Sequence, residues 1–543
     1  MKSFILALVL AGMSLRPGFA SGSPSPVPDG PATVRAEAAP PTGEAVLRRP
    51  KTWRALIEEA VLLTASTIDY WEAYNKFSVD WEFTWATFGR KFFTAQSPKM
   101  DSNAFWYNWS HAGAGAGYYS MARGNGFDNR VSTLFTFITS AVWESATEWR
   151  ELIAINDMIF TTFGGPAIGE PLYQISSYFS HRAGVVNGLA GFVFNPVLAV
   201  NNWFDRRSGP AANSVPDAGW HRFNLYAGLK EDKVSPAGTT AADQSGLGYR
   251  QFNLGFDMET DTSPGAGRAS NDRRFLGDTL SSRAAMDLSF SSAGMEEIRI
   301  RTSAVLIGQS SSSVALDPEG SLRGGSVVLG YGTAFEMLKK RSVAWYDGND
   351  EVPEGGQAPT GDARLVRPAP TGFTDKLAVI SPLGAVLTLS RFGTRFHLRW
   401  TSAAYGDFAM VNALAYNKFT ESHDTGGVKT TLLDWGYYYA LGMTLATDAA
   451  VDWRQWRFRG EASWQSYYSI QGQDRYQYTG IVTDDFKLHD TRLSWRFTFG
   501  YRLSGTPLEL GLAAEGIGRA GRLPGISEHY RELSFFYQAR LVF

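Results

Sequence analysis

Two glutamates four residues apart are the first candidates for chemistry in this 543-residue sequence. Glu144 and Glu148 lie in a stretch with helical periodicity, from about Val131 to Glu151, and residues i and i+4 share one face of a helix. If that face is buried, repulsion between the two negative charges raises the pKa of one of the carboxyls, and a cation is required between them. Four further residues of the region complete this candidate polar cluster: His111, Arg123, Asp157 and Glu170. The cluster could bind a divalent cation, or its arginine could neutralise the glutamates.

A structural role competes with that chemistry. The two glutamates could belong to a buried hydrogen-bonded network that seats helices against each other, and we favour this interpretation over catalysis or metal binding. For His111 alone, a structural histidine is again favoured. A Ser/His hydrolase is disfavoured because Ser110 and His111 are neighbours, which point to opposite faces of a strand.

Glycines alternate at Gly113, Gly115 and Gly117, close to the histidine. A phosphate-binding loop would require a following Walker lysine and a strand-to-helix unit, and the sequence has neither here. We therefore interpret these glycines as positions of close packing between helices or strands.

The polar residues recur in a fixed order of motifs. Asn-x-x-His is followed by a glycine-rich stretch, Trp-Glu-x-x-x-Glu, Asn-Asp and Gly-x-x-x-Gly-Glu, at 108–111, 113–126, 143–148, 156–157 and 165–170. This order resembles the domain-of-unknown-function 3943 family of bacterial outer-membrane-type proteins over roughly residues 103–204. One departure is Ala112, which follows the histidine where the family commonly has proline. The resemblance implies a family and no activity.

Helices must position the cluster within residues 51–205. An amphipathic stripe begins at Thr52, and the further helical patterns cover about 131–151, 166–179 and 183–204. The last stretch is uncharged and long enough to span a membrane. Its Asn195-Pro196 pair favours a bent helix packed on protein, with an inner-membrane helix as the alternative.

Beyond Gly219 the period of the pattern changes to two. Residues 219–543 therefore predict an antiparallel transmembrane β-barrel of about 12 strands, within a range of 10 to 14, so the fold is mainly β with an α-helical N-terminal segment packed in or against the barrel. The expected strands lie near 219–229, 247–259, 283–292, 296–309, 324–336, 376–392, 394–405, 430–447, 452–470, 488–503, 506–517 and 530–543.

Arginines in the later strands oppose bulky aromatic residues. Because arginine facing lipid near the middle of a membrane costs about 2–4 kcal/mol, we expect these arginines to face the lumen. They are Arg457, Arg459, Arg496, Arg502 and Arg540, and the residues expected to face lipid are Trp456, Trp464, Trp495, Phe497 and Phe543. Such a lumen would favour anionic solutes.

The two ends of the chain indicate export and insertion. Residues 1–20 read as a signal peptide and 21–50 as a disordered linker. The final strand ends on Phe543 and resembles the signal that the barrel-assembly machinery reads, so that machinery and outer-membrane lipid are the expected partners, and the outer membrane is the expected location. No cysteine is present, and a formal charge of −2 gives no sign of a nucleic-acid partner.

Three functions remain open from the sequence. The first is a plugged channel or ligand-binding barrel with a polar, arginine-lined lumen. The second is an envelope enzyme that acts on lipid or cell-wall material through His111, Glu144, Glu148 and Asp157, with a divalent cation as a possible cofactor. The third is a structural or assembly factor of the outer membrane.

Overall fold

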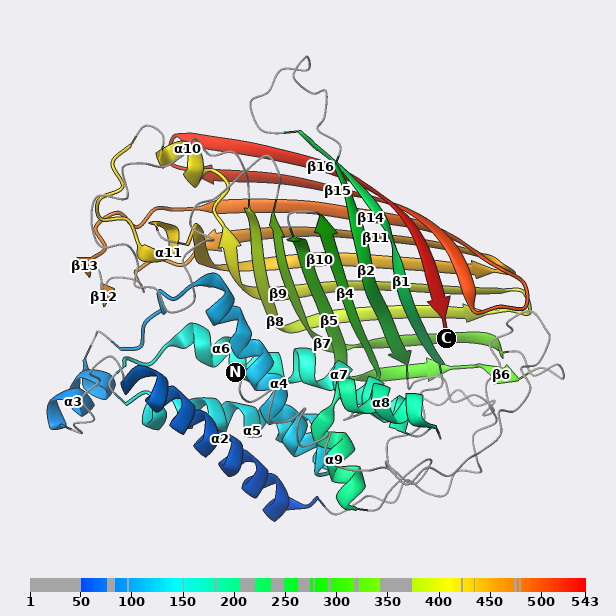
Figure 1. The fold of residues 1–543 in the computed structure, drawn as a ribbon, viewed down its shortest axis with the longest axis horizontal. Helices are drawn as coiled ribbons and strands as arrows, with labels where there is room; N and C mark the ends of the chain where they lie inside the picture. Colours follow the sequence, from blue (N-terminus) through cyan, green and yellow to red (C-terminus); the bar gives the residue numbers. More distant parts are fainter. Residues whose placement is uncertain are drawn as a thin grey trace.

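A computed structural model describes the chain from the first helix to the C-terminus, with gaps (Figure 1). The described residues are 50–75, 84–94, 97–149, 151–180, 182, 184–205, 220–235, 249–261, 274–276, 279–291, 294–316, 322–341, 374–420, 423–433, 435–472, 476–477 and 480–543. The expected signal peptide (1–20) and almost all of the expected linker (21–50) lie outside them.

Twelve long antiparallel strands of the described chain form a closed barrel. Each strand pairs with its sequence neighbours, and β1 closes the ring on β16, where Asn224 lies opposite Val542. The strands are β1 (Trp220–Ser235), β2 (Tyr249–Asp261), β4 (Ser281–Ser291), β5 (Gly294–Ser312), β7 (Leu322–Arg341), β8 (Thr374–Phe392), β9 (Phe396–Asn412), β10 (Tyr437–Trp453), β11 (Trp456–Ser469), β14 (His489–Arg502), β15 (Leu508–Leu523) and β16 (Ile526–Val542). Short strands are β3 (Arg274–Leu276), β6 (Ala315–Leu316), β12 (Tyr476–Gln477) and β13 (Gly480–Ile481). The expected strand number is confirmed.

The helices before the barrel form one group on one side of it (Figure 1). They are α2 (Thr52–Asn75), α3 (Trp85–Phe93), α4 (Phe105–Gly124), α5 (Asn129–Val142), the π-helical turn η1 (Trp143–Thr147), α6 (Ile155–Gly164), the π-helical turn η2 (Gly165–Gly169), α7 (Glu170–Ser180), α8 (Val185–Phe194) and α9 (Pro196–Phe204). We call this group the helical unit. In the part of the chain that the structure describes, no helix combines the length and apolarity needed to cross a membrane. The described part of the expected stretch 183–204 instead contains two short helices that meet at Asn195-Pro196.

The helix pattern departs from the sequence prediction at α4. Glycine is less favourable than alanine in a helix by about 1 kcal/mol per residue. Because of the glycines at 113, 115 and 117, the sequence pattern did not predict this helix. Packing against α6 overrides that intrinsic preference. The expected helix over 131–151 is also shorter, because α5 ends at Val142 and continues as a π-helical turn.

Alternation along each strand separates an inner from an outer face of the barrel. On β10, Asp448 faces inward, because it accepts a hydrogen bond from Arg283 of β4 across the lumen. Tyr438 lies on that same face. Tyr437 and Tyr439 lie on the alternate positions and therefore face outward.

The helical unit packs on the outer face of the barrel. Asn108 of α4 donates hydrogen bonds to the hydroxyls of the two outward tyrosines, Tyr437 and Tyr439, at 2.8 and 2.6 Å. A buried apolar cluster continues this contact with Phe105, Ala112, Phe160 and Ala167 from the helices and Phe335, Met337, Ala378, Ile380, Phe408 and Met410 from β7, β8 and β9. A second cluster packs Ile175 and Tyr178 of α7 against Phe223, Met258 and Ala284 of β1, β2 and β4. Helix packing against the barrel is thus confirmed, and the contact is with its outer wall.

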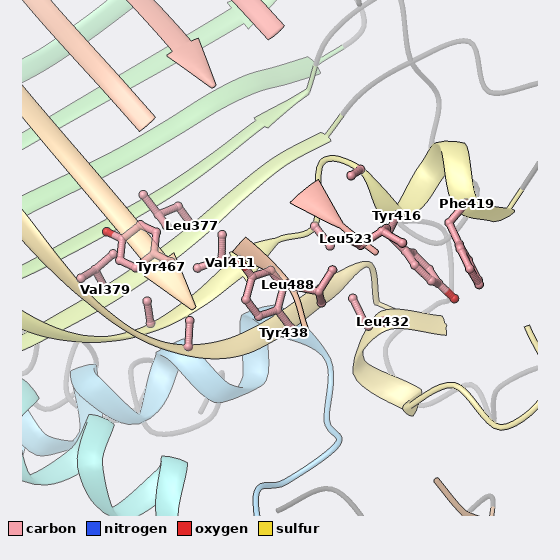
Figure 2. Packing of buried hydrophobic residues seen from close by; sticks show 14 of the residues in the cluster. Leu377, Val379, Val411, Tyr416, Phe419, Leu432, Tyr438, Tyr467, Leu488 and Leu523 are labelled. Atoms are coloured by element: carbon pink, nitrogen blue, oxygen red, sulfur yellow. The ribbon is translucent and has the colours of Figure 1, made fainter. Parts of the chain in front are cut away.

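A third apolar cluster lies at one end of the barrel (Figure 2). Inward residues of the strands, among them Leu377, Val411 and Tyr438, meet side chains from the connection between β9 and β10. That connection contains the short helices α10 (Tyr416–Thr420) and α11 (Thr430–Leu433). Figure 2 shows Tyr416, Phe419 and Leu432 beside the strand residues. We call this cluster the lumen plug.

Candidate functional site

The polar cluster lies inside the helical unit, around α4 and α6. The two helices approach closely, and backbone pairing places the chain before α4 beside the start of α6: Lys99 N–H donates to Ile153 O at 3.0 Å, and Ile155 N–H donates to Lys99 O at 2.9 Å. This pairing brings Asp101 beside Asn156, whose side-chain oxygen accepts the Asp101 N–H at 2.7 Å. Carboxyls from three segments therefore gather in one buried region.

His111 of α4 lies beside Asp157 of α6. Its Nδ1 is 3.6 Å from Asp157 Oδ1, and 3.1 Å from the carbonyl oxygen of Tyr107. Burial lowers the pKa of His111, which favours the neutral imidazole. A neutral ring with hydrogen on Nδ1 donates to that carbonyl, so the contacts satisfy a structural histidine.

Glu144 and Glu148 are both buried, at 2% and 7% exposure. They do not share a regular helical face, because the Glu148 N–H donates to the carbonyl of Trp143, five residues back, at 3.0 Å. Ala154 N–H donates to Glu144 Oε2 at 2.9 Å, and the Trp143 indole donates to Glu148 Oε1 at 2.8 Å. The carboxyls are therefore solvated by neutral donors of the protein.

The cation beside these glutamates is Lys91 of α3, a residue that the sequence analysis missed. Its buried ammonium donates to the carbonyl oxygens of Glu144 and Glu148, the latter at 2.7 Å. Burial lowers the pKa of Lys91, and the neighbouring carboxylates act in the opposite direction. The sequence contains little indication of this role. A single lysine in a short helix rich in aromatic residues is usually an exposed, solvated side chain.

The acidic residues outnumber this cation. Burial raises the pKa of Glu144 to about 7, and it raises the pKa of Glu148 well above its ordinary value with a further contribution from the negative charge of Glu144. Burial and the nearby carboxylates raise the pKa of Asp157 as well, and burial raises that of Glu151. The cluster can therefore hold protons near neutral pH as hydrogen-bonded carboxylic acids.

Arg123 and Glu170 form a separate pair. Arg123 Nε and Nη2 donate to the two oxygens of Glu170, both at 2.8 Å, and the Tyr119 hydroxyl donates at 2.6 Å. Thr279, just before β4, also donates to Glu170, at 2.5 Å. Burial alone would raise the pKa of Glu170, but the guanidinium and these donors outweigh it and lower the pKa to about 2. The arginine neutralises Glu170, and the expectation that it neutralises Glu144 and Glu148 is wrong.

A metal centre has no geometric support at this site. Among the residues that the structure describes, no group of three or more histidine, aspartate or glutamate side chains is arranged to hold a metal ion. Each of these four side chains is instead held by its own hydrogen bond to a neutral group: His111 to the Tyr107 carbonyl, Glu144 to Ala154 N–H, Glu148 to the Trp143 indole and Asp157 to the Asn156 amide.

The arginines expected in the lumen lie on inward positions, and carboxylates surround them. Arg457 donates to Asp452 at 2.7 Å, Arg459 pairs with Asp257 and Asp448, Arg496 lies 3.3 Å from Asp287 and Arg540 lies 3.4 Å from Glu509. Arg502 is half-buried, with its Nη2 3.5 Å from the carbonyl oxygen of Val542. Acids therefore pair with most of these arginines, and the arginine spacing alone does not support a preference for anions.

A closed antiparallel barrel with an apolar outer wall and a charged interior defines the outer-membrane β-barrel class, here with a helical unit on its outer wall. Within the helical unit, residues 97–197 match a family model described as "Domain of unknown function (DUF3943)". The family resemblance of the motifs is thereby confirmed over this segment.

Solved outer-membrane proteins resemble the barrel. A Pseudomonas aeruginosa FadL homologue is 10% identical, covers 59% of this chain and 89% of its own, and has a TM-score of 0.18. The Pseudomonas putida toluene transporter TodX is 10% identical, covers 60% of this chain and 90% of its own, with a TM-score of 0.18. The outer membrane channel DcaP of Acinetobacter baumannii is 11% identical, covers 60% and 97%, and scores 0.19. At these values nothing about a transported compound is carried over. No curated protein matches the sequence.

Proposed function

We propose that this protein is an integral outer-membrane barrel that does not conduct solutes, and that the barrel anchors the helical unit at the membrane. The observation that carries this proposal is an ion-pair network that crosses the lumen. It uses side chains from opposite walls, so it occupies the path that a channel would need.

Arg283 of β4 is the centre of that network. Its guanidinium donates to Asp257 of the neighbouring strand β2 at 3.0 Å. It also donates to Asp448 of β10 at 3.1 Å and to Glu461 of β11 at 2.6 Å. Strand β4 lies far from β10 and β11 around the ring, so these bonds run through the interior. A hydrated ion must break several charge-assisted bonds to pass, and these are among the stronger hydrogen bonds in proteins.

The network extends along the barrel toward the plugged end. Further inward pairs on that side join Arg299 to Glu515, Lys230 to Glu297, Lys340 to Glu532, and Arg492 and Arg519 to Asp375. Toward the opposite end of the barrel, Arg399 pairs with Glu259 and Asp261. At the plugged end, the lumen plug adds an apolar barrier around Tyr416 and Phe419. Two barriers of different chemistry in series support a closed barrel over a gated one.

The burial of the polar cluster favours anchoring and network formation over catalysis. A substrate would have to reach Glu144 or Asp157, which are 2% and 3% exposed. Hydrogen bonds within the helical unit account for the placement of both. The enzyme alternative thus has less support than a buried network that sets the fold of the unit.

Single-channel recording on the full-length protein in planar bilayers tests the proposal. We expect no current steps from the unaltered protein. Arg283→Ala combined with Tyr416→Ala and Phe419→Ala removes the centre of the ion-pair network and two members of the lumen plug, and should produce measurable leak. Arg130→Ala, an exposed arginine of α5, is the matched control that should stay silent. Discrete steps from the unaltered protein would refute the proposal.

A further inference from the structure

Two helices of the helical unit expose apolar side chains, although acidic side chains of the same unit are buried. Leu134, Phe137 and Ile138, which lie on one face of α5, are 52%, 45% and 50% exposed, while the carboxyls described above are buried. On α2, Ile57 and Val61 are 61% and 63% exposed. Contiguous apolar surface of this kind marks contact with lipid or another protein. The outer wall of the barrel also exposes apolar side chains, so both surfaces are suited to contact with lipid.

A pocket opens between α3, α5 and α6 in this part of the unit. Its volume is about 430 Å³, which falls in the range of small-molecule sites. Its walls are almost entirely aliphatic and aromatic, formed by Phe92, Phe137, Ile153, Ile155, Met158, Ile159 and Phe163. Phe92 and Phe137 are also exposed, at 39% and 45%, so the pocket joins the outer apolar surface.

Three polar groups interrupt these apolar walls. The hydroxyl oxygens of Thr162 and Ser97 are buried and have no hydrogen-bond partner among the residues described. Thr162 itself is only 6% exposed. The third is Lys91, whose ammonium has three hydrogens and donates to two carbonyl oxygens. Buried hydroxyls without a partner are unfavourable, and a ligand oxygen in the pocket would satisfy them.

We propose that this pocket binds a fatty acyl chain, with the hydrocarbon against the isoleucines and phenylalanines and the carbonyl or carboxylate oxygens at Thr162, Ser97 and Lys91. The same chemistry comes from two sources, a membrane phospholipid or a free fatty acid. This site goes beyond the proposed function, because it lies on the helical unit and does not depend on whether the lumen conducts.

Photo-crosslinking in vesicles of the full-length protein tests the site. One set of vesicles carries a palmitic acid with a diazirine in its chain, and a second set carries a phosphatidylethanolamine with the same group. We expect crosslinked peptides from α5 and α6 that contain Phe137 or Met158. Crosslinking by the acid alone identifies a free fatty acid, and crosslinking by the phospholipid identifies a membrane lipid.

Variants separate the pocket from the general lipid surface. Ile159→Trp fills the pocket and should lower the yield at these peptides about tenfold, whereas Leu134→Trp, on the outer face of α5, should leave it unchanged. Thr162→Val keeps the shape and removes one donor, so roughly threefold to tenfold weaker binding is expected. Hydrogen exchange of the α5 and α6 amides verifies the fold of the helical unit in each variant, and heat-modifiable migration verifies the barrel. Crosslinks absent with both probes, or equal in yield with the pocket filled and open, would overturn the proposal.

Discussion

The glycines of α4 allow a comparison within one helix. A β-carbon added at Gly115 would lie 1.9 Å from the carbonyl oxygen of Thr161 in α6, a backbone atom that cannot move by itself. A β-carbon added at Gly113 or Gly117, two residues away on either side, would meet no atom within 4 Å. Close approach of α4 and α6 therefore depends on one glycine of the three.

The expected effect follows from two opposing contributions. Replacing a helical glycine by alanine stabilises a helix by about 1 kcal/mol, and this gain is similar at both Gly115 and Gly117. Overpacking costs about 1–3 kcal/mol, and it applies at Gly115 alone. Because the gain cancels in the comparison, Gly115→Ala should be less stable than Gly117→Ala by about 1–3 kcal/mol, with Gly117→Ala more stable than the parent protein.

Hydrogen exchange on the full-length protein in micelles measures this difference. Urea dependence of exchange for the α4 and α6 amides gives the opening free energy of the helical unit, while heat-modifiable migration reports the barrel separately. Gly164→Ala, whose β-carbon would lie 2.4 Å from the Cα of Ala112, tests the same contact from the α6 side. Equal stability of Gly115→Ala and Gly117→Ala would show that α4 and α6 do not pack as described.

Three further outcomes are expected. Glu144 has a pKa of about 7 in the folded unit and an ordinary pKa of 4.5 in the unfolded chain, so the folded unit keeps its proton to a higher pH. The stability that this proton contributes is therefore fully present below pH 4.5 and is lost as the pH rises to about 7. The loss is up to about 3 kcal/mol. Glu144→Gln should flatten this dependence in hydrogen exchange at pH 5 and 8, and an unchanged slope would contradict it. Glu170→Gln leaves Arg123 buried without its carboxylate and should destabilise the unit by about 3–5 kcal/mol in urea unfolding, with Arg130→Ala as the neutral comparison. Phe543, whose N–H donates to the Phe223 carbonyl at 2.9 Å across the closing seam, should be required for assembly, so Phe543→Asp should lower the amount of heat-modifiable barrel in outer-membrane fractions; wild-type abundance would count against this.

The alternating pattern by itself determined the barrel. Trp495 and Phe497 alternate with Arg496, and this period of two places charge on one face and apolar bulk on the other wherever the strand pairs. The same reasoning predicted most ends of the long strands to within a few residues of their observed positions. Asn195-Pro196 likewise identified the bend between α8 and α9, because proline lacks the N–H that a continuous helix needs.

Tertiary structure decided everything that depends on which surfaces meet. The sequence shows that Glu144 needs a compensating group, but Lys91 comes from a helix more than 50 residues away, and Arg123 is taken by Glu170. The π-helical turn that carries Glu144 also depends on its surroundings. The apolar pattern of a sequence does not show where the backbone hydrogen bonds change from a spacing of four residues to a spacing of five.

The interior of the barrel gives the clearest case of this division. Arginine spacing fixed that Arg459 faces inward, yet the number of free charges in the lumen depends on Asp257 of a strand about 200 residues earlier. Strand periodicity is a local property of the backbone, so a sequence contains it directly. Ion pairing across a lumen depends on ring closure, strand register and the contacts of the helical unit, which arise only when the whole chain has folded.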